Sequence, residues 1–289
     1  MKKWPVVVGI SSVLTAMLAA VAGYELKTLK TTYYDIRTSK IKSGDAVRAV
    51  LLTDLHERNY GDDNIKLIRR VKKASPDIIL SAGDMITASE HPDYDSSIRL
   101  FRELAKIAPV YAAYGNHEKR MAEDVQYQDG FRKYFHALEN IGVCWLLNDS
   151  VQINQSVILS GLDIARKYYK KINRIFYPPM QMKHDLATIP KECFNIVLAH
   201  NPRFFSTYAQ SGADLFLAGH YHGGAVRLFG GKVGVVSPQF RMFPKYSRGL
   251  YEKEDAKMIV SAGCGSHKVN LRINNKPEVV VIDIHGNLV

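Results

Sequence analysis

The stretch Leu215–Gly224, LFLAGHYHGG, joins an apolar run to two histidines that stand one residue apart. The run predicts a buried strand, and positions i and i+2 at a strand end face the same side. His220 and His222 are therefore able to reach one cluster of ligands, and the flanking glycines allow the backbone to turn tightly around it. The simpler alternative is a solvated loop with two ordinary histidines, so the rest of the chain has to decide.

Four other predicted strands, at residues 46–53, 77–81, 110–114 and 195–199, are followed by residues of similar chemical type. The residues that follow them are Asp54-Leu55-His56, Gly83-Asp84, Gly115-Asn116-His117-Glu118 and His200-Asn201-Pro202. Binding sites of α/β sheets assemble at the carboxyl ends of strands, so these side chains can converge. A single Asp or Asn after a strand is usually a turn residue or a helix cap, but five recurrences favour a common site.

Strand-like and helical patterns alternate through the first half of the folded region and predict an α/β fold. The second half is richer in strand-like runs, which lie at residues 143–147, 157–160, 195–199, 214–218, 232–236, 257–261 and 278–284. These runs are too many for a single short sheet. We therefore expect two packed mixed β-sheets flanked by helices.

The first 24 residues predict a segment that targets a membrane. Two lysines at positions 2 and 3 precede an uncharged stretch, Trp4 to Tyr24, whose apolar part is close to the roughly 20 residues that cross a bilayer. We favour an uncleaved, single-pass transmembrane helix, with Ala20-Val21-Ala22 leaving signal-peptide cleavage and secretion as the alternative. The lysines favour a cytoplasmic N-terminus and an extracytoplasmic catalytic domain at the cell membrane.

The residues after this segment divide into two predicted parts. Residues 25–45 are polar and basic without a sustained period, which predicts a linker. The folded domain is expected to span residues 46–289. The sequence contains no internal repeat and no low-complexity tract.

Composition narrows the classes of partner. The chain of 289 residues has a formal net charge of +11, which suits anionic lipid or a phosphorylated substrate. The charge is spread along the chain and no arginine-rich run or aromatic nucleic-acid motif occurs, so nucleic acid is not an expected partner. The three cysteines, Cys144, Cys193 and Cys264, form no Cys-x-x-Cys pair and imply no disulfide framework.

The candidate metal ligands offer nitrogen and oxygen donors without a thiolate. They are Asp54, His56, Asp84, Asn116, His200, His220 and His222. This donor set suits zinc, manganese or iron and disfavours a structural cysteine-zinc site. Seven ligands are too many for one tetrahedral ion and fit two divalent ions that share a carboxylate, an arrangement that serves hydrolysis of phosphate esters.

The ordered motifs resemble those of the calcineurin-like metallophosphoesterase superfamily, in particular its membrane-associated or exported bacterial branch. Asp-x-His, Gly-Asp, Gly-Asn-His-Glu, a single His after a strand and Gly-His-x-His occur complete and in order within residues 46–289. The resemblance implies a four-layer sandwich. It also implies that Asp54, His56 and His222 hold one metal, that Asn116, His200 and His220 hold the other, and that Asp84 bridges them. It gives His117 contact with the phosphoryl oxygen and with the leaving group, and no metal.

The function that follows is dinuclear metal-dependent hydrolysis of phosphomonoester, phosphodiester or pyrophosphate bonds by attack of a metal-bridging hydroxide. One alternative is a lipid-linked pyrophosphatase at the membrane, acting on a substrate of the UDP-diacylglucosamine type. A second alternative is a metal-binding envelope scaffold without catalysis. The expected partners are a phosphoester or phospholipid-like substrate and the membrane, and the sequence leaves the oligomeric state open.

Some residues near the motifs are candidates to select the substrate. Residues 164–177 are basic and aromatic, and as a helix they would present an apolar stripe to the domain, to a membrane or over the active site. We favour packing on the domain. Arginines are candidates to bind a second phosphate, and Arg120 is preferred among Arg58, Arg120, Arg227 and Arg241. Tyr221 stands where related sequences often have threonine and is expected to line the cleft.

Overall fold

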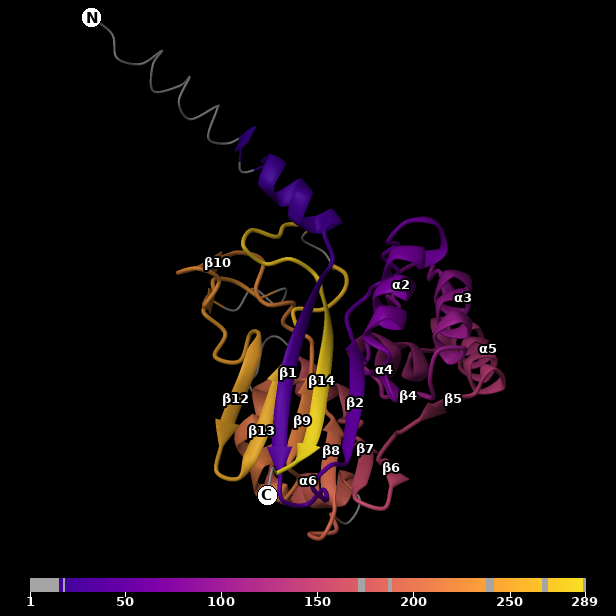
Figure 1. The fold of residues 1–289 in the computed structure, drawn as a ribbon. Helices are drawn as coiled ribbons and strands as arrows, with labels where there is room; N and C mark the ends of the chain where they lie inside the picture. Colours follow the sequence, from indigo (N-terminus) through magenta and orange to yellow (C-terminus); the bar gives the residue numbers. More distant parts are fainter. Residues whose placement is uncertain are drawn as a thin grey trace, which may run out of the picture.

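The architecture is described from a computed structural model. It describes residues 16–17, 19–170, 175–186, 189–237, 242–266 and 270–287. Two six-stranded sheets pack against each other, and helices lie on the outer faces (Figure 1). This arrangement confirms the predicted α/β fold with mixed sheets flanked by helices.

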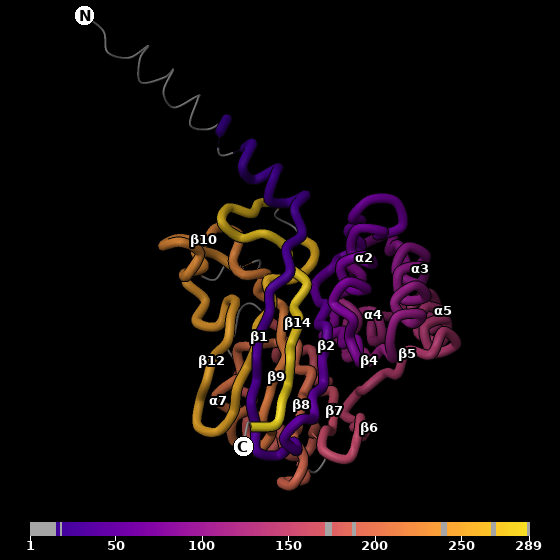
Figure 2. The backbone as a smooth tube through the Cα atoms, in the orientation of Figure 1, coloured from indigo at the N-terminus to yellow at the C-terminus, as the bar shows by residue number. Residues whose placement is uncertain are grey.

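The first sheet has the strand order β1-β14-β2-β3-β4-β5. Its strands are β1 (Lys30–Thr38), β14 (Glu278–Gly286), β2 (Ala46–Leu52), β3 (Ile78–Ser81), β4 (Val110–Ala112) and β5 (Val143–Trp145). Strand β14 is parallel to β1 and antiparallel to β2, and the strands from β2 to β5 are parallel to one another. The sheet is therefore mixed, and β1, β14 and β2 run side by side in Figures 1 and 2.

The second sheet has the strand order β12-β13-β9-β8-β7-β6. Its strands are β12 (Gly249–Lys253), β13 (Ala256–Val260), β9 (Leu215–Ala218), β8 (Phe194–Leu198), β7 (Val157–Gly161) and β6 (Asp149–Asn154). The four central strands are parallel and both edge pairs are antiparallel. A separate hairpin pairs β10 (Arg227–Leu228) with β11 (Val233–Gly234).

The α-helices carry buried apolar residues on the face that packs against the sheets. They are α2 (Ile65–Ala74), α3 (Tyr94–Ala105), α4 (Asn116–Glu123), α5 (Val125–Ile141), α6 (Pro179–Asp185) and α7 (Phe205–Tyr208). Short 3-10 turns are η1 (Asp62–Asn64), η2 (Arg166–Tyr169), η3 (Pro202–Phe204) and η4 (Ala209–Ser211). In α2, for example, Leu67, Val71 and Ala74 are buried and share one face.

Three apolar clusters separate the four layers. Because side chains alternate across a strand, Val50 of β2 packs with the helices α2, α3 and α5, whereas its neighbour Leu51 faces the second sheet. Strand β8 behaves in the same way: Ile196 lies between the sheets, and Val197 packs with α6 and α7. The order of layers is therefore helices, sheet, sheet, helices.

The first sheet begins before the predicted domain boundary. Residues Lys30–Thr38, within the segment predicted as a linker, form edge strand β1 and pair with β14 in the register Lys30↔Glu278. The linker prediction is wrong for these residues. An edge strand is covered only in part, and Ile36 alone in β1 is fully buried, so the apolar alternation that reveals an inner strand is absent.

The predicted membrane anchor, residues 1–24, lies largely outside the described residues: the structure does not describe residues 1–15 and 18. Residues 19–27 are helical and lead into β1. Among the residues that the structure describes, no helix combines the length and the apolar character needed to cross a membrane.

Two local predictions differ from the structure. Of the strand predicted at 232–236, Val233–Gly234 forms β11 and only these two residues pair in the hairpin. The apolar stripe considered for the insertion at 164–177, made of Ile164, Tyr168, Ile172 and Ile175, required a helix, but in its described part only Arg166–Tyr169 forms a helical turn, of 3-10 type. Residues 171–174, which include Ile172 of the proposed stripe, lie outside the described residues. Ile164 and Tyr168 are nevertheless buried against the domain.

Candidate metal centre

The predicted ligands follow strands whose carboxyl ends meet at one end of the molecule. Asp54, Asp84 and Asn116 come after β2, β3 and β4, and His200 and His220 come after β8 and β9. The strands within each of these two sets are parallel, which brings the loops of each sheet to the same edge.

Three groups of buried side chains are close enough to hold metal ions. They are Asp54, His56 and His222; Asp84, His200 and His220; and His56, Asp84 and His117. Within each group, one ligand atom per residue lies within 4.8 Å of the others. The first two groups correspond to the two predicted half-sites.

Asp84 lies between the two half-sites, as predicted for a bridging ligand. Its Oδ2 atom is 3.2 Å from Nε2 of His200 and 3.9 Å from Nε2 of His56. Its Oδ1 atom accepts a hydrogen bond of 2.8 Å from the backbone N–H of His117. One carboxylate oxygen is thus fixed by the start of α4, and the other faces histidines of both groups.

His200 shows that the site fits a cation. Its Nδ1–H donates to the carbonyl oxygen of Ala82 over 2.7 Å, which leaves Nε2 as the acceptor nitrogen. This Nε2 atom is buried and has no hydrogen-bond donor among the described residues. It faces Asp84 Oδ2, another acceptor. With the ring neutral, two buried acceptors face each other without a donor, which is costly. A proton on Nε2, which the adjacent Asp84 favours, removes that cost in the metal-free protein, and a metal ion shared by the two atoms would take the place of that proton.

Asn116 completes the second half-site. Its terminal amide lies 2.7 Å from Nδ1 of His220 and 3.3 Å from Oδ2 of Asp84. With the amide nitrogen inward, Asn116 donates to both atoms. With the oxygen inward, three acceptors converge, which is the arrangement that a bound cation stabilises. All seven predicted ligands are therefore gathered at one centre.

The backbone is strained at most of the predicted ligands. Five of the seven have a positive φ: Asp54 (51°), His56 (49°), Asp84 (55°), His220 (69°) and His222 (49°). Non-glycine residues in this region cost about 1–3 kcal/mol each and cluster at functional sites. The strain turns the chain sharply after each strand and directs these side chains into the centre.

Tight packing of the two loops supports Asp54. The backbone N–H of His220 donates to both carboxylate oxygens of Asp54, at 3.0 and 3.1 Å, and the hydroxyl of Thr53 donates over 2.9 Å. A Cβ atom at Gly219 would lie 2.1 Å from Asp54 Oδ2. Only glycine at position 219 leaves room for this contact between the loops of the two sheets.

Burial and neighbouring charges set the protonation of the centre. Burial raises the pKa of Asp54 to about 6. Burial also raises the pKa of Asp84, but attraction by His200 and His117 outweighs it and holds that pKa well below its ordinary value. Burial lowers the pKa of His200, whereas the adjacent Asp84 raises it, to about 9. Burial and His200 hold the pKa of His220 well below its ordinary value. Asp84 is ionised and His220 is neutral, the forms that bind metal.

Glu118 is a supporting residue to which sequence reasoning gave no role. Its buried carboxylate accepts hydrogen bonds from the backbone N–H groups of Asp84 and Met85, both at 2.8 Å, and of Gly115 at 3.0 Å. It therefore fixes the loop that carries Asp84 against the loop that carries Asn116. The Glu three residues after the helix N-cap is the available sequence signal, although Gly115 lacks the Ser or Thr of a typical capping box.

We expect Glu118→Gln to destabilise the protein by about 1–3 kcal/mol, because the amide nitrogen would face backbone donors that lose their acceptor. Unfolding of the full chain in urea, followed by tryptophan fluorescence, measures this change. Glu139→Gln is the matched control, since Glu139 lies on α5 and pairs with His136 at the surface. Equal midpoints for the two variants would contradict the supporting role of Glu118.

Two tyrosines pack against the histidines. The ring of Tyr169, from the insertion, lies 5.5 Å from the His220 ring and 6.1 Å from the His200 ring. Tyr221 is 3% exposed and lies 5.4 Å from His220, so it packs beneath the loop instead of lining an open cleft as expected. Tyr169 was not singled out from sequence, and its place in a basic, aromatic insertion was the only signal.

The candidate arginines occupy different surroundings. Arg120 forms an ion pair of 3.0 Å with Asp124 on the surface of α4, and its phosphate-binding role stays a prediction. Arg58 donates to the carbonyl oxygen of Leu26 over 2.7 Å. Arg227 is buried among backbone carbonyl groups, and Arg241 lies outside the described residues.

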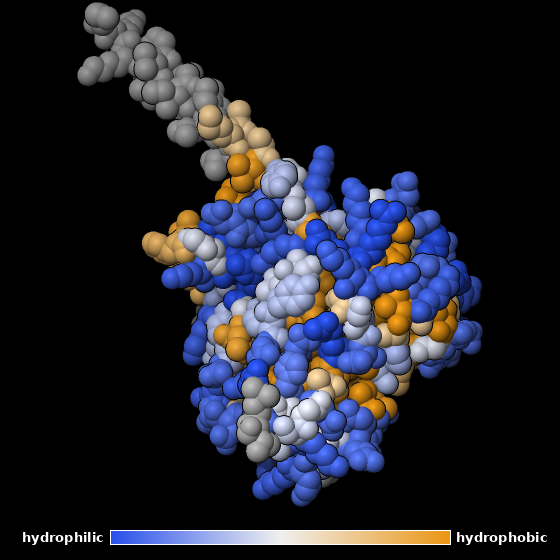
Figure 3. Space-filling model, in the orientation of Figure 1, coloured by the Kyte–Doolittle hydropathy of each residue, from blue (hydrophilic) through white to orange (hydrophobic). Residues whose placement is uncertain are grey.

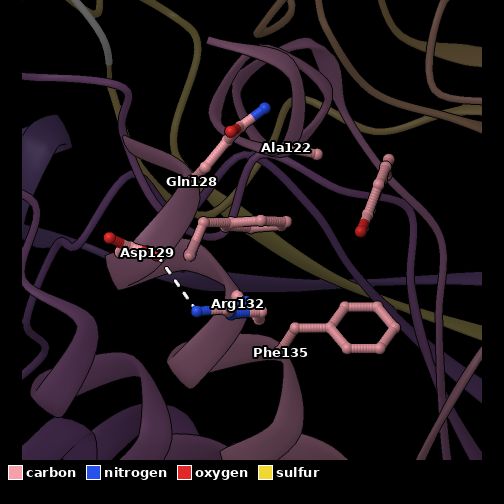
Figure 4. Close-up of a pocket in the computed structure, with 7 residues that line it drawn as sticks. Ala122, Gln128, Asp129, Arg132 and Phe135 are labelled. Atoms are coloured by element: carbon pink, nitrogen blue, oxygen red, sulfur yellow. Dashed lines mark hydrogen bonds and ion pairs between the residues drawn. The ribbon is translucent and has the colours of Figure 1, made fainter. Parts of the chain in front are cut away.

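A pocket of about 340 Å³ is lined by residues of α4 and α5 and by Tyr114 after β4 (Figure 4). Its lining residues are Tyr114, Ala122, Gln128, Asp129, Phe131, Arg132 and Phe135. The dashed line in Figure 4 marks the ion pair of 3.1 Å between two of these residues, Arg132 and Asp129. The cavity is formed by α4, α5 and the end of β4, so it is separate from the histidine and aspartate cluster.

Two mixed sheets between helical layers, with buried Asp and His clusters at their carboxyl ends, define a metallophosphoesterase fold. The sequence model of the calcineurin-like phosphoesterase family matches residues 47–224. The chain belongs to this family.

Sequence relatives of the chain support the same family. The chain is 26% identical to an uncharacterized metallophosphoesterase of Aquifex aeolicus, over 94% of the chain and 98% of the relative. It is 27% identical to the phosphodiesterase YaeI of Escherichia coli, over 72% of the chain and 70% of the relative. It is 25% identical to the UDP-2,3-diacylglucosamine pyrophosphatase LpxG of Chlamydia muridarum, over 96% and 98% of the two chains.

Proposed function

We propose that this chain is a dinuclear metal-dependent phosphoesterase that hydrolyses phosphomonoester, phosphodiester or pyrophosphate bonds. The observation that supports it is the position of Asp84, whose Oδ2 atom faces His200 of one cluster and His56 of the other. In this proposal Asp54, His56 and His222 hold one ion. Asn116, His200 and His220 hold the second, with Asp84 shared.

Two bound divalent ions would supply Lewis acidity for the phosphoryl oxygens and lower the pKa of water to generate a nucleophile. Manganese, zinc and iron all suit the donor set. Only Asp54 and Asp84 among the proposed ligands carry a formal negative charge, so the loaded centre is net positive and attracts phosphate.

His117 is proposed to act on the substrate. The backbone N–H of Ala88 donates to its Nδ1 over 2.8 Å, so the neutral ring carries its proton on Nε2. A protonated Nε2 is a hydrogen-bond donor and not a metal ligand. This tautomer supports contact with a phosphoryl oxygen and transfer of a proton to the leaving group.

A second candidate is cleavage of a pyrophosphate bond in a nucleotide-linked lipid. The relative that favours it is LpxG of Chlamydia muridarum, which aligns over nearly the whole of both chains. A basic, aromatic insertion next to the histidines, through Tyr169, is consistent with an amphiphilic substrate.

The cell membrane is the proposed location. The uncharged stretch Trp4–Tyr24 supports a single-pass anchor, and the two lysines before it support a catalytic domain outside the cytoplasm. Cleavage after Ala22 and secretion is the alternative. Sequencing the N-terminus of the mature protein distinguishes the two.

Metal dependence tests the proposed function. We expect protein purified without added metal to contain about two first-row ions per chain by elemental analysis. Removing them with a chelator should reduce hydrolysis of aryl phosphate mono- and diesters to background, and manganese, zinc or iron should restore it. Full activity in the metal-free protein would contradict the proposal. Two bound ions without hydrolysis of any ester would favour the non-catalytic scaffold.

A further inference from the structure

A group of exposed apolar side chains surrounds the β10–β11 hairpin, and we call it the hairpin surface. It consists of Leu228, Phe229, Val233, Met242 and Phe243. Leu228 and Val233 are paired across the hairpin. The segment that carries Met242 and Phe243 lies beside the second hairpin strand, because the backbone N–H of Phe243 donates to the carbonyl oxygen of Val235 over 2.8 Å. Phe229 is 76% exposed and Met242 is 61% exposed. Figure 3 shows apolar atoms on the projection that Figure 1 labels β10. Exposed apolar side chains gathered in this way mark interaction surfaces.

Hydrogen bonds of Arg227 attach the hairpin surface to the loop that carries His220 and His222. Arg227 is buried at the base of the hairpin, and its guanidinium donates to the carbonyl oxygens of Gly231 at 2.7 Å and Lys232 at 2.9 Å. The same group donates to the carbonyl oxygen of Gly223, the residue after His222. One side chain therefore joins the hairpin turn to the loop that carries two predicted ligands.

The hairpin surface lies at the end of the molecule from which the N-terminal segment leaves. Strand β1 is parallel to β14 and β14 is antiparallel to β2, so β1 starts at the edge where β2 ends. The ligand loops are at that edge, and the helix of residues 19–27 enters β1 there (Figure 1). The hairpin follows the same edge, after β9.

Side-chain contacts hold the helix against the ligand loop. The carboxylate of Glu25 accepts a hydrogen bond of 2.8 Å from the backbone N–H of Asn275. The amide of Asn275 in turn donates to the carbonyl oxygen of His222 over 2.7 Å. The helix of residues 19–27 therefore leaves the domain beside the metal centre.

Charge at this end matches an anionic surface. Lys27, Lys232 and Lys245 are exposed, the first at the end of the helix and the others beside the hairpin surface. Lysines beside apolar side chains are typical of segments that lie on anionic bilayers, where the apolar groups enter the acyl boundary and the ammonium groups meet lipid phosphates.

We propose that the hairpin surface docks on an anionic lipid bilayer and holds the metal centre toward it. The substrate is then a phosphoester of an amphiphile that resides in that bilayer. This inference rests on the proposed function for the chemistry, but the docking itself is independent of it. The hairpin surface supplies the apolar contact, and Arg227 transmits its position to the His220–His222 loop.

Two phosphodiesters that share the same leaving group test whether the hairpin surface favours substrates that reside in the bilayer. The full chain is reconstituted in vesicles of phosphatidylglycerol and phosphatidylcholine and given hexadecyl p-nitrophenyl phosphate, which enters the bilayer, or ethyl p-nitrophenyl phosphate, which stays in water. We expect Phe229→Glu to slow hydrolysis of the hexadecyl ester about tenfold or more, since a large apolar side chain that enters the bilayer is lost. The rate with the ethyl ester should stay unchanged. Tyr33→Glu, at an exposed aromatic side chain of β1, should change neither rate.

A second variant reports docking without catalysis. In vesicles containing brominated lipids, Phe229→Trp should show strong quenching beyond that of the native tryptophans. Glu252→Trp, on β12 at the opposite end of the second sheet, should show none. Quenching of Phe229→Trp in a chain that hydrolyses neither ester would refute the proposed function and keep the docking surface. The docking proposal would be overturned by equal quenching of the two variants or by an unchanged hexadecyl rate in Phe229→Glu. It would also be overturned by an equal loss of rate in Tyr33→Glu or by a change of oligomeric state in Phe229→Glu.

Discussion

Asp84→Asn is expected to lower kcat for phosphoester hydrolysis by on the order of a thousandfold and to reduce the metal content of the purified protein. The substitution keeps the size of the side chain and an oxygen that accepts from the backbone N–H of His117. It removes the negative charge between His200 and His56. Both ions would lose their shared anionic ligand, so the effect should exceed that of losing any ligand of one ion alone.

Kinetics and elemental analysis of the same preparation measure this result. Asp185→Asn is the matched control: Asp185 is also buried, but it binds the hydroxyl of Tyr177 and the amide of Gln181 on the outer layer of the second sheet. We expect the control to keep both metal and turnover. An Asp84→Asn protein with a full complement of metal and wild-type kcat would show that Asp84 does not bridge the centre.

The gathering of the candidate ligands at one end of the molecule was predictable from sequence because each of them lies within a few residues of a strand end. The apolar run before Asp54, or before His220, identifies a buried strand, and the ends of neighbouring parallel strands converge whatever the loops between them do. At these residues, the local sequence pattern and the position in the folded sheet therefore lead to the same prediction. The positive φ values at Asp54 and His220 were not predictable, since they arise from packing between loops of different sheets.

Features that depend on distant partners were missed. Strand β1 is stabilised by β14, almost 250 residues away in sequence according to the pairing Lys30↔Glu278, and its exposed, polar face gave no local signal. The spacing of Ile164 and Tyr168 fits a helix, yet the described part of this segment has only the 3-10 turn Arg166–Tyr169. Both residues are buried in the apolar cluster that also contains Phe204 and Tyr208. The conformation of both segments depends on strand pairing and burial against residues far away in the sequence, and local secondary-structure propensity does not encode these contacts.

His117→Ala is expected to lower kcat by about 10²- to 10⁴-fold, the range of a lost general acid, while the protein keeps its bound metal. Ala88 fixes the ring by donating to Nδ1, which leaves a protonated Nε2 toward the His56 and Asp84 side of the centre. The loss should depend on the leaving group. An alkoxide needs a proton on departure, whereas p-nitrophenolate leaves without one, so alkyl phosphates should lose far more rate than p-nitrophenyl phosphate.

Rates across a series of leaving groups, with metal content measured in parallel, separate this role from that of a ligand. His136→Ala provides the control, because His136 lies on the surface of α5 and pairs with Glu139. A uniform loss for all leaving groups would assign His117 to binding of the phosphoryl oxygen and not to proton transfer. Loss of one bound ion together with the activity would instead make His117 a metal ligand, which its proximity to His56 and Asp84 permits. In that case Nε2 of His117 would have to lose its proton, contrary to the tautomer that the hydrogen bond from Ala88 sets.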